Sequence, residues 1–269
     1  MKQTTSQNYD AAYKHLFDYP GIVKQLLENF IPVKWVDYKK LEKVNASFVR
    51  RNYKKKESDV IYKLNFKDQT AYLYLLIEFQ STVDSNMPFR IQSYVNDFYE
   101  SLLKKEKKDR YPIIFPVVIY NGDKPWLAAD NVKDKIEIPK DPKLAPYIPS
   151  LKYFKIIINE FKKSSLMKIR NILSSIFLIE QMDIKEFDAQ LSELVKIIKE
   201  ELDPNLIDAF QNWFQRFIEG EPLPKAETLI QANEKEVYTM FATSVKKWEK
   251  ELEKKGKIEG KIETAVKML

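Results

Sequence analysis

The stretch SDVIYKLNFKDQTAYLYLLIEFQ, residues 58–80, decides the fold of this chain. It contains two runs, 59–66 and 70–80, that are rich in the β-branched and aromatic residues typical of strands. A short polar connection, Lys67 to Gln69, separates the runs. The pattern predicts an antiparallel hairpin. If that hairpin turns between Asp68 and Gln69, Asp59 lies opposite Glu78.

Asp59 and Glu78 are the candidate chemical groups of this hairpin. Opposed residues have Cβ atoms about 4.5–5.5 Å apart, and Gln80 falls on the same side of its strand as Glu78. Two close carboxylates repel each other unless a cation lies between them, and Mg²⁺ is a hard cation that takes oxygen ligands. We therefore expect a site for magnesium, or for another divalent cation, held by Asp59 and Glu78. The alternative is an exposed hairpin end where both side chains face solvent or a lysine.

The segments on either side of the hairpin predict an α/β domain. Apolar residues follow helical spacing in 13–17, in 23–30 and again in 87–107. Residues 111–120, YPIIFPVVIY, are almost wholly apolar, which is typical of a strand covered on both faces. We expect a mixed sheet flanked by helices over residues 1–160.

Beyond this core the sequence predicts only helices. The expected helices span 166–182, 185–201 and 204–219, with Asp203 and Pro204 at the start of the third. We interpret residues 161–235 as a helical domain. We interpret residues 236–269 as a basic helical tail, either a frayed helix or an arm for homo-oligomerisation.

Composition excludes several classes of function. The 269 residues include no Cys and one His, which excludes thiolate zinc sites, thiol nucleophiles and multi-His metal clusters. The five Gly form no close set for binding phosphates, which argues against a nucleotide cofactor. A net charge of +6 permits a polyanionic partner without requiring one. A polar start and the lack of an apolar run of about 18 residues predict a cytoplasmic protein with no membrane partner.

Five short segments carry a family resemblance. They are Asp10–Phe17 (DAAYKHLF), Ser58–Ile61 (SDVI), Ile77–Ser81 (IEFQS), Phe89–Tyr94 (FRIQSY) and Tyr120–Gly122 (YNG). In this order they resemble the landmarks of the recombination-promoting nuclease (Rpn) family. That family is also called YhgA-like putative transposases and is placed in the PD-(D/E)XK nuclease superfamily.

The resemblance implies a PD-(D/E)XK-like fold and a metal-dependent DNA endonuclease linked to recombination or mobile DNA. It assigns metal binding to Asp59 and Glu78, and it places Gln80 where most of the superfamily has Lys. A carboxamide cannot abstract a proton, so Gln80 would orient the water or the phosphate, and magnesium would activate the water. Lys14 resembles a family Lys that would reach the scissile phosphate. A solvated surface lysine is the alternative.

Basic residues near these positions suggest contacts with nucleic acid. A run immediately before Asp59 would bind DNA phosphates, although such a run is also typical of a solvated strand edge. Arg90, on the helix after the hairpin, would position the DNA backbone. Two rival functions stay open: a catalytically idle module for nucleic-acid binding or assembly, and a phosphodiesterase acting on RNA or nucleotides. The residues of the basic run are Arg50, Arg51, Lys54, Lys55 and Lys56.

Overall fold

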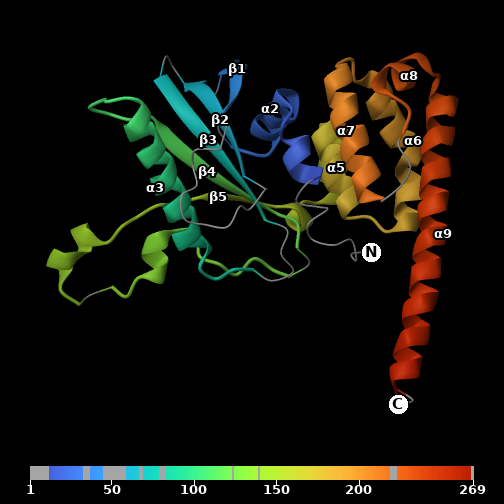
Figure 1. Ribbon diagram of the computed structural model, residues 1–269. Coiled ribbons are helices and arrows are strands. Elements are labelled where there is room, and N and C mark those ends of the chain that lie inside the picture. Colours follow the sequence, from blue (N-terminus) through green and yellow to red (C-terminus); the bar gives the residue numbers. More distant parts are fainter. Residues whose placement is uncertain are drawn as a thin grey trace. The chain divides into compact units, whose positions relative to one another are not determined.

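The computed structural model describes eight stretches of the chain: 12–32, 37–44, 59–66, 69–78, 83–122, 124–138, 140–218 and 223–267. The described chain forms two compact units, of which the first ends at Lys162 and the second begins at Lys163 (Figure 1). The first unit contains a sheet, and the second consists of helices.

The first unit is built on a five-stranded mixed sheet with the strand order β1-β2-β3-β4-β5. The first three strands pair antiparallel, whereas β3, β4 and β5 run parallel to one another. The predicted α/β class, a mixed sheet flanked by helices and followed by a helical region, is confirmed. The strands are β1 (Asp37–Val44), β2 (Asp59–Phe66), β3 (Gln69–Glu78), β4 (Ile113–Tyr120) and β5 (Phe154–Ile157).

The interior strands are the ones that the sequence predicts. β4 is paired on both sides, and Val117 to Tyr120 are fully buried, as expected for an almost wholly apolar run. The two edge strands are not predicted. β1 has the sequence DYKKLEKV and β5 has only four residues. Charged or very short segments are common at sheet edges and carry little strand signal.

Helix α3 (Met87–Lys105) packs on one face of the sheet through an apolar stripe that includes Ile91 and Phe98. On this face it meets a cluster that includes Ile61 and Tyr74. Helix α2 (Pro20–Asn29) lies on the other side of the sheet from α3 (Figure 1). The sheet is therefore a buried middle layer, as in other α/β domains.

Tyr62 joins the first helical residues to the sheet. Its side chain is fully buried, and its hydroxyl donates a hydrogen bond of 2.9 Å to the carbonyl of Phe17. Burial, with a smaller contribution from the nearby Asp18 carboxylate, raises the pKa of Tyr62 well above its ordinary value. The hydroxyl is therefore neutral and able to donate at neutral pH.

Replacing Tyr62 with phenylalanine should lower the free energy of unfolding by about 1–3 kcal/mol, because a buried carbonyl loses its donor. A urea unfolding curve measures the change. The control is Tyr147→Phe, at a side chain that is 81% exposed, which should unfold like the wild type. Equal midpoints for Tyr62→Phe and wild type would show that this hydrogen bond does not stabilise the fold.

The second unit buries an aromatic core between its longer helices. Phe210, Trp213, Phe214 and Phe217 line one side of α7, and Phe241 of α9 packs against Phe210 and Phe214. No helix in the described part of the chain has the length and apolar content to cross a membrane. The helices are α4 (Lys163–Ile169), α5 (Ile172–Glu180), α6 (Ile184–Glu200), α7 (Pro204–Phe217), α8 (Ala226–Gln231) and α9 (Glu234–Lys267).

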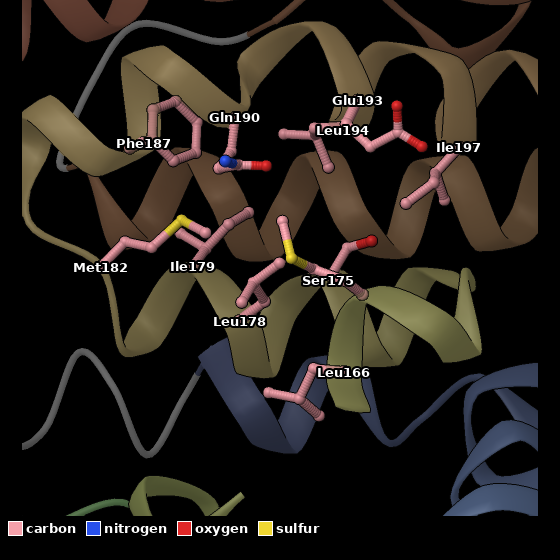
Figure 2. Close-up of a pocket in the computed structure, with 11 residues that line it drawn as sticks. Leu166, Ser175, Leu178, Ile179, Met182, Phe187, Gln190, Glu193, Leu194 and Ile197 are labelled. Atoms are coloured by element: carbon pink, nitrogen blue, oxygen red, sulfur yellow. The ribbon is translucent and has the colours of Figure 1, made fainter. Parts of the chain in front are cut away.

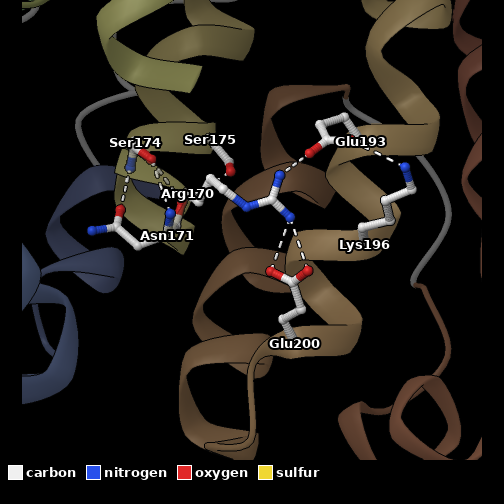
Figure 3. Close-up of polar contacts among 7 residues, drawn as sticks. All are labelled: Arg170, Asn171, Ser174, Ser175, Glu193, Lys196 and Glu200. Atoms are coloured by element: carbon white, nitrogen blue, oxygen red, sulfur yellow. Dashed lines mark hydrogen bonds and ion pairs between the residues drawn. The ribbon is translucent and has the colours of Figure 1, made fainter. Parts of the chain in front are cut away.

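The helix predicted over 166–182 is instead two helices, and this prediction is wrong. Asn171 caps α5 by a capping box, in which it accepts the Ser174 N–H at 2.8 Å and Ser174 Oγ accepts the Asn171 N–H. Arg170 takes a left-handed backbone conformation with φ 50°. Figure 3 shows the Arg170 guanidinium bound to Glu193 and Glu200 of α6, contacts that hold the break in place. The predicted cap of α7 by Asp203 is confirmed.

Candidate functional site

The pocket between α4, α5 and α6 in the second unit offers few chemical groups (Figure 2). Its lining is apolar except for Ser175, Gln190 and Glu193, and Glu193 is bound to Arg170. A pocket with one carboxylate that already has a cationic partner lacks the paired groups that acid–base or metal chemistry needs. The sheet of the first unit is the better candidate.

β2 and β3 bring Asp59 and Glu78 to one edge of that sheet. This edge is formed by the ends of the strands and is distinct from the outer strands β1 and β5. β2 begins at Asp59 and β3 ends at Glu78, and the two strands are antiparallel. The register pairs Asp59 with Leu76, so the prediction that Asp59 lies opposite Glu78 is wrong by two residues. Phe66 pairs with Gln69, which leaves two residues between the strands. The hairpin is thus centred one residue earlier in the chain than the sequence interpretation assumed.

The observed register makes Asp59 and Glu78 diagonal neighbours on one face of the sheet. Diagonal positions have Cβ atoms about 7–8 Å apart. Magnesium binds oxygen at about 2.1 Å, and each carboxylate extends beyond its Cβ, so ligands from these two positions can reach one cation. The side chains of both residues lie outside the described ones. Among the described side chains, no group of three or more His, Asp or Glu could hold a metal.

Helix α3 covers the face that carries both positions. Along β2 and β3, Ile61 and Tyr74 pair with each other and belong to the core beneath α3. Asp59 is two residues from Ile61 and Glu78 is four residues from Tyr74, so all four positions share this face. The candidate metal ligands therefore lie at the end of the α3-covered face.

Two aromatic contacts give the direction of α3 across the sheet. Tyr72 meets Phe98 edge-on, with ring centroids 4.9 Å apart, and Tyr74 stacks on Tyr94 at 6.2 Å. Moving toward the end of β3 therefore means moving toward the start of α3, and the two elements are antiparallel. The start of the helix points to the same edge of the sheet as Glu78.

The same spacing can be continued to that edge. Two strand residues advance about 6.6 Å and four helix residues advance about 6 Å. By this measure Arg90 is level with Leu76, the partner of Asp59, and Asn86 is level with Glu78. The N-terminus of a helix carries partial positive charge, which favours nearby anionic groups.

The parallel strands β4 and β5 end at the same edge. Glu78 pairs with Tyr120, which in turn pairs with Ile157. In open α/β sheets, ligands bind at the carboxyl ends of the parallel strands. The edge that holds Glu78 is therefore the expected place for a site in this fold.

The turn after β4 is held at this edge by its own contacts. Asn159 donates its side-chain N–H to the carbonyl of Gly122 at 2.7 Å, and the Tyr120 hydroxyl donates to the carbonyl of Lys124 at 3.0 Å. A Cβ atom at Gly122 would overlap the Tyr120 ring, so this position requires glycine. Sequence reasoning did not find Asn159. An isolated Asn after a short strand carries no signal of its own.

Lys14 belongs to the helical residues 12–16 and is half-buried. Three residues later, the Phe17 carbonyl accepts the hydrogen bond from Tyr62. Tyr62 alternates with Ile61 along β2, so it faces away from α3. The helical segment of Lys14 thus meets the sheet on the face opposite to Asp59. The role of Lys14 at the phosphate stays a prediction, and it requires this side chain to reach past the edge of the sheet.

Other predicted site residues lie outside the described ones. They are Gln80 and the basic run Arg50, Arg51, Lys54, Lys55 and Lys56. Both groups stay predictions. Both are close in sequence to the candidate metal ligands. The basic run ends three residues before Asp59, and Gln80 follows Glu78 by two residues.

Arg90 is described, and its guanidinium binds a carboxylate. Its Nη1 atom lies 3.1 Å from Oδ2 of Asp84, and the two side chains are 20% and 29% exposed. Sequence reasoning did not find Asp84. The pair connects the chain just before α3 to the first turn of that helix.

Comparison with known families gives a match over most of the chain. The family model described as "Putative transposase, YhgA-like" matches residues 7–205. No solved structure matches the chain significantly.

Several curated bacterial proteins are similar to this chain. Recombination-promoting nuclease RpnD of Escherichia coli O157:H7 is 27% identical over 129 residues, which are 46% of this chain and 50% of the relative. The inactive recombination-promoting nuclease-like protein RpnE of Escherichia coli K12 is 27% identical over 177 residues, 64% of this chain and 57% of the relative. Recombination-promoting nuclease RpnC of the same strain is 26% identical over 126 residues, 46% and 42% of the two chains. The chain thus spans about half the length of the curated relatives it matches.

Proposed function

This chain belongs to the YhgA-like putative transposase family, and from that premise we propose that it is a magnesium-dependent DNA endonuclease acting in recombination or on mobile DNA. Relatives named as nucleases support the proposed class of activity, while a relative named inactive makes activity a question for experiment. The observation that carries the proposal is the register of β2 and β3. It puts two acidic positions on one face and at one edge of the sheet, and the start of α3 points to the same edge.

Each residue of the proposed site has a distinct task. Asp59 and Glu78 would hold the cation, which when bound makes water more acidic and offsets charge that develops on the phosphate. Gln80 would orient the attacking water by hydrogen bonds, because its amide cannot take a proton. Lys14 would contribute a positive charge to the phosphate.

The basic run before Asp59 would bring DNA to this edge. Lysines and arginines that bind phosphates release counterions from DNA, so affinity should fall steeply with salt. Proximity of the run to Asp59 along the chain supports the proposal. We place the reaction in the cytoplasm, with DNA as the partner.

The proposal is tested with supercoiled plasmid and the full chain. We expect nicked and linear products with Mg²⁺ and none with EDTA. A thermal melt in the same buffers should show a higher melting temperature with Mg²⁺, because a ligand that binds only the folded state stabilises it. Intact plasmid at every Mg²⁺ concentration would overturn the endonuclease proposal.

Two further substrates separate the rival functions. Cleavage of single-stranded RNA or of small phosphodiesters, with plasmid left intact, would favour the alternative phosphodiesterase. Binding of plasmid without cleavage, and with no effect of Mg²⁺ on melting, would favour a catalytically idle nucleic-acid-binding module.

A further inference from the structure

We propose that Arg90 and Asp84 form a positioning pair that holds the start of α3 in place at the edge of the sheet to which Glu78 also belongs. In this role Arg90 affects cleavage through Asp84 and does not bind DNA itself. The inference rests on the proposed function for its effect on cleavage, and it has a separate structural readout.

The ion pair between Arg90 and Asp84 is partly buried. Arg90 and Asp84 are 3.1 Å apart, with side chains only 20% and 29% exposed. Lys104 and Glu100, farther along the same helix, are 57% and 66% exposed. Exposed pairs of that kind contribute little to stability. A partly buried arginine–carboxylate pair is less solvated, and its hydrogen bonds are more directional.

The second observation is that Asp84 is bonded from several directions. Its Oδ1 accepts the backbone N–H of Asn86 at 2.8 Å, and its carbonyl accepts the N–H of Met87 at 3.0 Å. Val83, just before it, packs against the core beneath α3. The end of the β3–α3 connection is therefore fixed by packing, by the helix start and by Arg90.

The third observation is where this fixed point lies. Asp84 follows Glu78 by six residues, so the two are at most about 20 Å apart along the chain. By the spacing of the two aromatic contacts, Arg90 is level with Leu76, the strand partner of Asp59. A pair at this place fixes the start of α3 near the proposed site. A shift of about 1 Å in a catalytic group can cost up to 10²-fold in rate.

Charge argues against direct DNA binding by Arg90. A guanidinium that contacts a phosphate contributes one released counterion, but here a carboxylate already occupies one side of it. Removing Asp84 would make Arg90 more available to DNA. The two roles thus predict opposite effects for Asp84→Ala.

The experiment compares Asp84→Ala, Arg90→Ala and the double variant with wild type. We expect each single variant to lower kcat on plasmid about tenfold, and the double variant to be no worse than either single, because the two residues act as one unit. Arg90→Lys should recover part of the loss. The slope of log affinity against log salt should equal that of wild type. Lys104→Ala, on the same helix, is the matched control and should behave like wild type.

The DNA-contact role gives a different result. Arg90→Ala would then reduce the salt slope by about 0.9, and Asp84→Ala would leave kcat unchanged or tighten DNA binding. Either outcome overturns the positioning pair.

Hydrogen exchange keeps this test independent of activity. Both single variants should exchange the amides of Asn86, Met87 and Arg90 faster than wild type, while Lys104→Ala should not. If the wild type fails to cleave any substrate, the proposed function fails, yet faster exchange would still support the pair. Unchanged exchange in both variants would overturn the pair even if the wild type is active.

Discussion

Replacing Asp59 with asparagine is expected to reduce magnesium-dependent cleavage of plasmid by about 100-fold or more. Magnesium is usually held by one or two protein carboxylates, and the substitution removes one of the two in the proposed site. A bound cation contributes several kcal/mol of charge stabilisation in the transition state, and each 1.36 kcal/mol is a factor of ten in rate. Initial rates of nicking over a range of Mg²⁺ concentrations measure the loss.

The matched control is Asp188→Asn, at an exposed residue of α6 in the other unit. It removes the same charge and should cleave like wild type. The rise in melting temperature with Mg²⁺ should also disappear in Asp59→Asn and persist in the control. Equal cleavage by Asp59→Asn and wild type would end the metal-site proposal.

Replacing Phe214 with alanine should lower the free energy of unfolding by about 3–5 kcal/mol, the usual cost of truncating a buried aromatic side chain. Phe214 is fully buried on α7. Its ring contacts Phe187, Phe210 and Phe241, with centroids 5.8, 5.7 and 5.3 Å away. Truncation leaves a cavity among rings from three helices, which cannot collapse without shifting all of them.

Urea unfolding followed by tryptophan fluorescence measures this change, since Trp213 lies in the same aromatic core. Leu202→Ala is the control in the same unit, because that side chain is 86% exposed and should change stability by no more than about 0.5 kcal/mol. A loss below about 1 kcal/mol for Phe214→Ala would mean that the aromatic core does not hold this unit together.

The hairpin shows how far local sequence can predict a site. Alternation of side chains places Asp59 and Glu78 on one face of the sheet, and the structure confirms the hairpin. The exact pairing depends on where the turn is centred, and a shift of one residue moved the partner of Asp59 from Glu78 to Leu76. Two turn positions one residue apart differ little in local free energy, so a pattern of strand residues does not determine which one forms.

The missed elements have a common physical cause. Neighbouring residues in the sequence only weakly indicate β1 and the helix break at Arg170. Both features are stabilised by partners elsewhere in the fold. β1 is a charged outer strand that pairs with β2, and Arg170 is held by Glu193 and Glu200 of α6. Asn159 and Asp84 likewise gain their roles from the atoms they contact.

The sequence by itself determined the α/β class, the hairpin with its two acidic positions and the capped helix at Asp203, because each depends on neighbours a few residues away. Only the tertiary structure decided that α3 runs antiparallel to β3, so that its start points to the edge of the sheet that holds Glu78, and that Arg90 binds Asp84. It also decided that Asn159 holds the turn after β4. These arrangements follow from packing a helix across a sheet and from the parallel order of β3, β4 and β5, which bring together residues far apart in the chain.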